Sequence, residues 1–468
     1  MKQYRSGVVD IGGVPLGGDY PVRLQSMTNT STGHTAASVA QCIRIAEAGA
    51  DYIRLSARDR AEAENLSNIK RELRRAGFNT PLIADIHFNP SVAITAARIV
   101  EKVRINPGNY ADKRATFTGI DIGEAEYQGE LERIHQRLLP LIEECRRCGT
   151  AIRVGVNHGS LSDRIMGRYG NTPMGMVVSA MEFIKIFAAE NFDRLVISMK
   201  SSNIVVMNSA TRMLASQMSA AGYNPPLHLG VTEAGEGEDG RIRSAMGIGS
   251  LLTDGIGDTI RVSLSEPPEA ELPVAGLIVE RSLLHLRGDG APPGGAFVSG
   301  GRGNGVLHLK YECDDHDELA VIASVDAAPW LLVGSAGDLT ISNRGALSKE
   351  LLTSVESGIL QAARIRMSRN DYISCPTCGR TTFDLPEAVA RVKKATGHLT
   401  GLKIAVMGCV VNGPGEMADA DYGYVGTASG TVHIYRRQEI VMRDVPAADA
   451  HIRLAELIES DMKMQGRV

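Results

Sequence analysis

The sequence predicts an α/β protein in which a (β/α)8 TIM barrel is followed by a small α/β insert and a C-terminal α+β domain. Three observations predict this order. Short β-rich runs alternate with longer amphipathic segments through the first 265 residues, residues 266–295 are rich in Pro and Gly, and closely spaced cysteines appear after residue 369. The expected domains are therefore 1–268, 269–366 and 367–468.

The barrel prediction depends on the number of strands. Eight strands with intervening helices in about 250 residues are typical of a TIM barrel, whereas a doubly wound open sheet more often uses about five or six. Apolar residues at helical spacing separate the runs. Strands are expected near 22–26, 51–56, 81–86, 102–105, 151–156, 194–199, 226–231 and 258–263, and helices over 36–48, 60–76, 127–147, 174–190 and 203–221.

The later segments are less regular. SEPPEAELPV and RGDGAPPGGAFVSGGRGNG have the composition of linkers or loops. An α/β segment is expected over 305–366, and the last unit, which carries CPTCG and MGCVVNGPGE, is expected to close with a helix around 446–462.

Composition narrows the class of protein. Hydrophobic residues make up 43% of the 468, charged residues 22%, and the formal net charge is −4, which is the balance of a soluble globular protein. No Lys/Arg block suggests nucleic-acid binding, and no apolar run suggests a signal peptide or a membrane span. A cytoplasmic location is expected, where thiols stay reduced, so the seven cysteines are core residues or metal ligands rather than disulfides.

Polar residues gather where the predicted barrel strands end. Alternate residues of a strand face the same side, and barrel enzymes build active sites at the carboxyl ends of their strands. This spacing groups Arg54 with Ser56, Asp85 with His87, Arg104 with Asn106, Arg153 with Gly155 and Asn157, Ser198 with Lys200, His228 with Gly230 and Thr232, and Arg261 with Ser263.

Five cations are thus expected at one mouth: Arg54, Arg104, Arg153, Lys200 and Arg261. Each could pair with a nearby carboxylate, but a polyanion such as a diphosphate explains the whole set better. Glu233, in the turn GVTEAGEG, is either a proton donor or a charge balancer.

The cysteines after residue 369 have the spacing of a metal knuckle. Cys375 and Cys378 flank Pro-Thr, and a zinc ribbon would need a second such pair downstream, which this chain lacks. Instead Cys409 follows, in a Gly-rich loop that ends at Glu416. Three thiolates and one carboxylate suit a [4Fe–4S] cluster. Cys145 and Cys148 lie late in a helical pattern and are interpreted as structural, and Cys42 and Cys313 as lone thiols.

Eight motifs in order resemble the 4-hydroxy-3-methylbut-2-enyl diphosphate synthase family. They are QSMTNT, ADIHFNP, RINPGN, RVGVNHGSL, HLGVTEAG, GIGDTIRVSLS, SCPTCGR and GCVVNGPGE. The likeness covers about residues 1–270 and 360–445. The insert resembles that of longer relatives but is much reduced, and it is expected to act as a spacer.

The resemblance implies reductive ring opening and dehydration of 2-C-methyl-D-erythritol 2,4-cyclodiphosphate in isoprenoid biosynthesis. Electrons would come from reduced ferredoxin or flavodoxin, and a homodimer is expected. The resemblance also implies residue roles. Cys375, Cys378, Cys409 and Glu416 would bind the cluster, with Glu416 also catalytic; Arg54, Arg104, Asn106, Arg153, Asn157, Lys200, Arg261 and Ser263 would bind substrate; Asp85, His87 and Glu233 would line the reacting end.

Two other classes fit part of the pattern. A pterin- or folate-type transferase barrel also builds anion sites at strand ends but does not need the cysteine motifs. A zinc-stabilised binding protein would use the cysteines but would be colourless. Colour and iron content of anaerobically purified protein distinguish the three.

Overall fold

A computed structural model describes residues 4–86, 88–110, 122–287, 296–300, 304–375, 381, 383–410, 413, 417, 420–427 and 430–464. The chain forms two compact units that do not follow chain order. One unit contains residues 1–231, 247–262 and 267–291, and the other contains 232–246, 263–266 and 292–468. The division into three domains stays a prediction.

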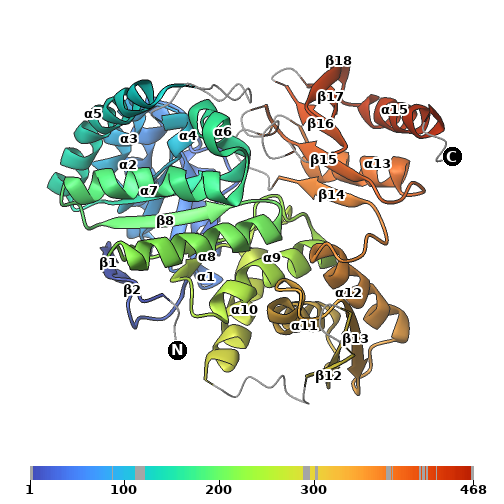
Figure 1. Cartoon of the computed structure of the whole chain (residues 1–468). Helices are drawn as coiled ribbons and strands as arrows, with labels where there is room; N and C mark the ends of the chain where they lie inside the picture. The colour runs from blue at the N-terminus through green and yellow to red at the C-terminus, as the bar shows by residue number, and fades with distance from the viewer. Residues whose placement is uncertain are drawn as a thin grey trace. The chain divides into compact units, whose positions relative to one another are not determined.

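The first unit is built around a parallel eight-stranded sheet (Figure 1). Its order is β8-β7-β6-β5-β4-β3-β10-β9, and a parallel bridge between Ile197 and Leu227 brings the two ends together. The predicted barrel and all eight strand positions are confirmed. The strands are β3 (Arg23–Met27), β4 (Tyr52–Ser56), β5 (Leu82–Asp85), β6 (Lys102–Ile105), β7 (Ala151–Asn157), β8 (Leu195–Lys200), β9 (His228–Leu229) and β10 (Thr259–Ile260).

Helices connect these strands, and their apolar residues explain where they form. In α2 (Arg60–Arg75), Ala63, Leu66, Ile69 and Leu73 are buried at helical spacing, and the Asp59 side chain caps the first turn by accepting from the Glu62 N–H. The five predicted helices are confirmed. The helices are α1 (Thr35–Glu47), α2, α3 (Pro90–Ala97), α4 (Pro107–Tyr110), α5 (Glu124–Cys148), α6 (Asp163–Tyr169), α7 (Pro173–Ala189), α8 (Ile204–Ala220), α9 (Gly237–Leu252) and α10 (Glu271–Leu286), with short 3-10 turns at His158–Ser160 and Pro268–Ala270.

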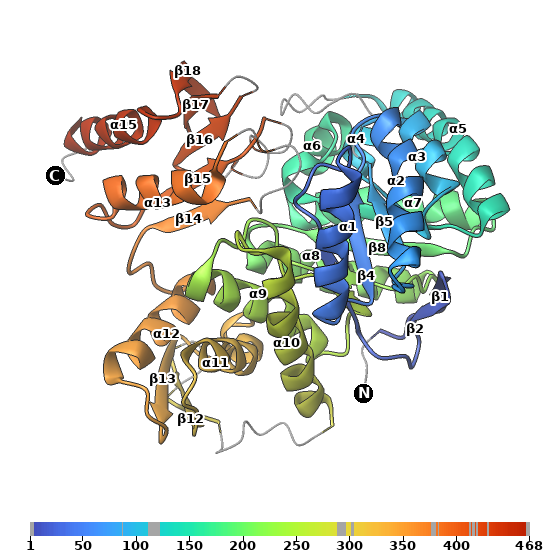
Figure 2. The ribbon, with the colours of Figure 1, turned by 180° about the vertical axis from the view of Figure 1, so that it is seen from behind.

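A hairpin that the sequence analysis missed precedes the barrel. Strands β1 (Val8–Ile11) and β2 (Val14–Gly17) pair antiparallel, and Ile11 and Leu16 pack against Tyr52, Ile83, Ala151 and Val196. Each of these four barrel residues, from Tyr52 to Val196, is the first or second residue of its strand. The hairpin therefore covers the amino-terminal end of the barrel, opposite the predicted mouth (Figure 2).

The second unit contains the insert, which is α/β as predicted. Strand β11 (Phe297–Ser299) pairs antiparallel with β12 (Val306–Tyr311), and β12 pairs parallel with β13 (Asp338–Asn343). Helices α11 (His316–Leu331) and α12 (Lys349–Ala362) follow β12 and β13 in the chain.

The C-terminal part of this unit is a five-stranded mixed sheet, which confirms the predicted α+β architecture. Strands β14 (Asp371–Ser374), β15 (Lys403–Met407) and β16 (Tyr422–Gly426) are parallel, while β17 (Thr431–Arg436) and β18 (Glu439–Pro446) are added antiparallel. Helices α13 (Leu385–Thr396) and α15 (Ala450–Met464) share a core with Ile404, Val406 and Tyr424. Across the described residues, no helix has both the length and the apolar character needed to cross a membrane.

Candidate functional site

The predicted cationic residues lie on or directly after strands of the barrel, Arg54 and Arg153 within β4 and β7, Lys200 at the end of β8 and Arg261 just after β10. Asp85, Arg104 and Arg153 are paired in register across β5, β6 and β7, and Asn157 pairs with Lys200 across β7 and β8. Partners in register on parallel strands point to the same side of the sheet. The barrel therefore places these side chains in adjacent rows.

Among the described residues, two of the five cations pair with carboxylates and three do not. Arg104 Nη1 lies 3.1 Å from Asp85 Oδ1, and Arg261 Nη2 lies 2.9 Å from Glu271 Oε1. Within the described part of the chain, Arg54, Arg153 and Lys200 have no carboxylate oxygen within 4.0 Å. All five side chains are buried, with at most 8% exposed.

Burial makes these unpaired charges costly. Burial lowers the pKa of Arg54 to about 9. The nearby carboxylate of Asp85 opposes this shift, and the charges of Arg261 and Arg104 add to it. The pKa values of Arg153 and Lys200 are lowered well below their usual range, first by burial and then by neighbouring cations. A bound polyanion would supply the missing counter-charge and favour the protonated forms.

At two glycines the absence of a side chain leaves room for a cationic side chain to lie against the backbone. A Cβ on Gly155 would lie 2.6 Å from Arg104 Nε, and one on Gly230 would lie 2.7 Å from Lys200 Nζ. Neither glycine has a positive φ, so close approach rather than backbone conformation accounts for them.

Other polar contacts support this surface. Arg153 Nη1 donates to Ser198 Oγ at 3.0 Å, and Asn157 Oδ1 accepts from Arg104 Nη2 at 3.3 Å. Asn106, the residue directly before α4, donates to Ser160 Oγ at 2.8 Å. His87 lies outside the described residues.

Glu271, which contacts Arg261, and Lys102, at the start of β6, are two further buried charged residues that were missed from the sequence. Glu271 is 1% exposed and accepts from Arg261 and from Ser26 Oγ (2.7 Å), so it orients Arg261. Glu271 lies within SEPPEAELPV, which was predicted to be linker or loop; that prediction is wrong, because the run forms the 3-10 turn Pro268–Ala270 and the start of α10. Lys102 is fully buried with its Nζ 4.6 Å from the Tyr52 ring centre, and period-2 spacing from Arg104 would have found it.

Glu233 lies in the second compact unit, as does Ser263, which is also buried. The φ of Glu233 is 50°, in the left-handed region, which is uncommon for a residue other than glycine, and Glu233 is 8% exposed. The next residue, Ala234, forms a parallel bridge with Ser374, the residue before Cys375. The turn that carries Glu233 thus lies beside the strand that ends at Cys375.

Cys375 and Cys409 also come together. Each follows one of two adjacent parallel strands, β14 and β15, and Ser374 pairs with Val406 between them. The Gly408 N–H donates to Cys375 Sγ at 3.2 Å. Cys378 and Glu416 lie outside the described residues, and within those residues no group of three or more metal-ligating side chains occurs.

The surroundings of Cys375 fit a thiolate-bound cluster. The side chain packs against an apolar group that includes Ile373, Met407 and Val425, while the Gly408 amide points at its sulfur. A hydrogen bond to sulfur and an apolar shell are the means by which proteins tune iron–sulfur clusters.

The remaining cysteines are placed differently. Cys145 is buried in α5, where burial raises its pKa, and Cys148 is exposed at the end of the same helix. Cys42 and Cys313 are buried. The structural role predicted for these four stays a prediction.

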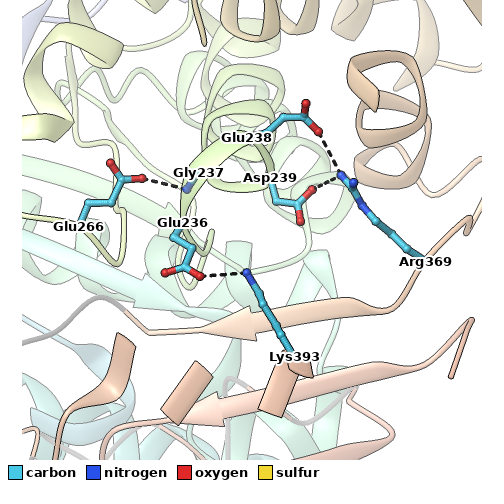
Figure 3. Close-up of a pocket in the computed structure, with 7 residues that line it drawn as sticks. All are labelled: Glu236, Gly237, Glu238, Asp239, Glu266, Arg369 and Lys393. Carbon is cyan, nitrogen blue, oxygen red and sulfur yellow. Dashed lines mark hydrogen bonds and ion pairs between the residues drawn. The ribbon is translucent and has the colours of Figure 1, made fainter. Parts of the chain in front are cut away.

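A pocket at the start of α9 contains only paired charges among its labelled residues (Figure 3). Lys393 Nζ lies 3.0 Å from Glu236 Oε1, and Arg369 bridges Glu238 and Asp239. Glu266 accepts from the Gly237 N–H at 2.8 Å. These contacts fix the first turn of α9 and the residue before it.

Fold and site define a class: a (β/α)8-barrel protein with a cationic mouth, joined to a sheet that presents cysteines at its strand ends. The GcpE TIM-barrel domain matches residues 6–276, and the GcpE protein C-terminal domain matches residues 371–460. The chain belongs to the GcpE family.

Curated relatives match almost the whole chain. A 4-hydroxy-3-methylbut-2-en-1-yl diphosphate synthase (flavodoxin) of Bacteroides thetaiotaomicron is 41% identical over 596 aligned positions, covering 97% of each chain. The protein of the same name from Porphyromonas gingivalis is 41% identical over 572 positions, covering 98% of each. Both alignments exceed the 468 residues of this chain, so these relatives contain segments that it lacks.

Solved structures give only a distant likeness. A truncated 3-deoxy-D-arabino-heptulosonate 7-phosphate synthase from Thermotoga maritima covers 61% of this chain and 94% of its own at 13% identity, with a TM-score of 0.37. A similarity of this size does not bear on function.

Proposed function

We propose that this protein converts 2-C-methyl-D-erythritol 2,4-cyclodiphosphate to (E)-4-hydroxy-3-methylbut-2-enyl diphosphate for isoprenoid biosynthesis. Two electrons enter, the ring C–O bond to phosphate breaks, and a hydroxyl group leaves as water after taking up a proton. Family membership and the names of the relatives support this reaction.

The observation that carries the proposal is the buried cationic mouth, in which carboxylates of the described residues pair with only two of the five cations. Arg54, Arg153 and Lys200 are buried without a carboxylate within 4.0 Å among the described residues, and a diphosphate would satisfy them. Arginine forks bind phosphate oxygens in pairs, while Lys200 acts as a point charge. The proposed substrate contacts are Arg54, Arg104, Asn106, Arg153, Asn157, Lys200, Arg261 and Ser263.

Glu233, Asp85 and His87 are proposed for the reacting end of the substrate. Asp85 is buried and ion-paired to Arg104, so it is suited to orient a guanidinium. Glu233 is a buried carboxylate on a strained turn, which suits a group that delivers or holds a proton at a fixed place.

We propose Cys375, Cys378, Cys409 and Glu416 as ligands of a [4Fe–4S] cluster, with Glu416 as the replaceable one. Such a cluster would supply electrons one at a time to the bound substrate. The apolar packing of Cys375 and its hydrogen bond from Gly408 support this assignment.

The proposed partners are reduced flavodoxin, which the names of the relatives specify, or ferredoxin, and a second copy of this chain. A cytoplasmic location, where thiols stay reduced, is part of the same proposal.

Anaerobic purification tests the proposal. The protein should be brown, contain about four irons per chain and convert the cyclic diphosphate when a reductant is supplied. Colourless protein with bound zinc would support the zinc-stabilised binding protein instead. Brown protein that leaves the cyclic diphosphate unchanged would remove the assigned reaction while keeping the cluster.

A further inference from the structure

The turn that carries Glu233 has a conformation that needs external support. A non-glycine residue in the left-handed region costs about 1–3 kcal/mol and persists only where its surroundings hold it. Glu233 has a φ of 50° and is 8% exposed. Of its neighbours in the chain, Ala234 is fully buried and Thr232 is half-buried.

Arg243 supplies much of this support. It lies in α9, its side chain is 10% exposed, and its guanidinium faces two stretches of main chain. Nη1 donates to the carbonyl oxygen of Ala234 at 3.3 Å and to that of Tyr372 at 2.7 Å. One side chain therefore connects the turn after Glu233 to the strand that ends before Cys375.

Asp371 holds the guanidinium in place. It accepts from Arg243 Nη2 and lies 3.2 Å from Arg364 Nη2. Burial opposes ionisation of Asp371, but the charges of Arg243, Arg364 and Lys403 outweigh it and lower the pKa of this carboxyl group. The anchor is thus ionised at neutral pH.

A second layer of contacts runs beside this guanidinium. The Ser265 N–H donates to the Gly235 carbonyl oxygen at 2.9 Å, and Ser265 Oγ lies 3.1 Å from Ser374 Oγ. Three residues after Glu233, Glu236 pairs with Lys393 (Figure 3). Arg243 is the member of this set that contacts both main chains through one rigid group.

We propose that Arg243 is a positioning residue that fixes the Glu233 carboxylate relative to the Cys375 sulfur, an inference that rests on the proposed function. The fork of a guanidinium can serve two carbonyls and a carboxylate at once, whereas glutamine reaches fewer acceptors and carries no charge. A shift of about 1 Å at a reacting group can cost about 100-fold in rate.

A double-mutant cycle tests this role. Arg243→Gln should lower kcat about 100-fold while leaving KM and iron per chain within about threefold of wild type. In a Glu233→Gln background, the same change should lower kcat less than about threefold, because Arg243 acts through Glu233. Arg243→Lys keeps the charge but loses the fork, so it should lower kcat by about tenfold, less than Arg243→Gln does.

The matched control is Arg241→Gln. Arg241 lies in the same helix, its side chain is 13% exposed, and it pairs with Glu266 and Asp317 and donates to the Gly237 carbonyl oxygen, four residues after Glu233. This variant should keep kcat within about threefold of wild type. If Arg243→Gln does not fold, Arg243→Lys is measured in the same cycle.

Two results would overturn the inference. Equal losses from Arg243→Gln with and without Glu233 would mean that the residue acts on the fold as a whole, and loss of iron in parallel with kcat would mean that it holds the cysteine loop. These failures differ from that of the proposed function, in which wild-type protein itself lacks iron or does not turn over the cyclic diphosphate.

Discussion

The barrel mouth and the cysteine loops both lie at the carboxyl ends of parallel strands, but they hold their functional groups in different ways. In the barrel, Arg104 and Arg153 project from within β6 and β7 and are buried. In the C-terminal sheet, Cys375 and Cys409 lie beyond the ends of β14 and β15 and are half-buried. Charges that bind an anion must be fixed before it arrives, whereas thiolates can be drawn into place by the metal they bind.

The largest effect is expected in the cysteine loops. Cys409→Ser should remove most of the iron and all turnover, because the proposed cluster would lose one of its three thiolate ligands. Iron analysis and the absorption spectrum measure the loss. Cys148→Ser, at an exposed thiol in α5, should keep both iron and turnover. Loss of iron from the Cys148 variant would mean that the ligands are assigned wrongly.

Glu233 comes next and separates chemistry from cluster binding. Glu233→Gln should keep full iron yet lower kcat by about 10²- to 10⁴-fold, the usual contribution of a positioned proton donor. Steady-state kinetics and iron content are measured on the same sample. Wild-type turnover in this variant would reduce Glu233 to a charge balancer.

At the barrel mouth, Lys200→Met should weaken pyrophosphate binding about 10- to 100-fold. The ligand-free variant should melt no lower than wild type, since one buried, mutually repelling charge is gone. Calorimetry and thermal melts give both values, with Lys185→Met on the exposed surface of α7 as the control. Arg261 is less suitable, because its removal would leave the buried Glu271 carboxylate without its cation.

Gly230→Ala tests the anion site of the barrel mouth without removing a charge. The new methyl group would lie 2.7 Å from Lys200 Nζ and 2.7 Å from the Arg261 carbonyl oxygen, so the ammonium must move. Pyrophosphate should bind about tenfold more weakly, the effect of losing about one charge-assisted hydrogen bond. Gly276→Ala in α10, which would meet no atom within 4 Å, should bind normally. Equal affinities for the two variants would exclude close packing of Lys200 as a requirement.

The smallest effect concerns Lys102, which is buried with its Nζ over the Tyr52 ring. Burial, aided by Arg153 and Arg54, lowers its folded-state pKa well below 10.5. Lys102→Met should therefore raise the free energy of unfolding at pH 7 by about 1–3 kcal/mol and leave turnover unchanged.

The pH dependence of stability tests the same lysine. Between the folded and unfolded pKa values the unfolded chain holds a proton that the folded chain lacks. The free energy of unfolding thus rises with pH, by up to about 1.4 kcal/mol per unit. The rise should be shallower in Lys102→Met. Identical slopes would show that Lys102 does not titrate on unfolding.

Much of the barrel was predictable because strand alternation and helical spacing are local properties. The same spacing placed Arg104 and Arg153 on one face, and the register confirms that face. The β1–β2 hairpin was missed although Gly12 and Gly13, both with positive φ, form a typical hairpin turn. That signal is present in the sequence and was overlooked.

Other features had no local signal. Glu271 is the first residue of α10 and lies ten positions after Arg261. Only the folded barrel brings the two side chains together. Arg243 has the sequence context of an ordinary helical arginine, and two of its partners, Asp371 and Tyr372, lie 128 and 129 positions away in the chain. Long-range contacts of this kind depend on the tertiary structure, which spacing alone does not specify.

The closure of the barrel has a consequence for how the protein is made. Strand β10 pairs with β3, so β3 gains its second neighbouring strand only after residues 259 and 260 have been synthesised. Arg261, one residue later, reaches the mouth only then. Until that moment the nascent chain has no assembled anion site, so early folding intermediates should not compete for diphosphates in the cell.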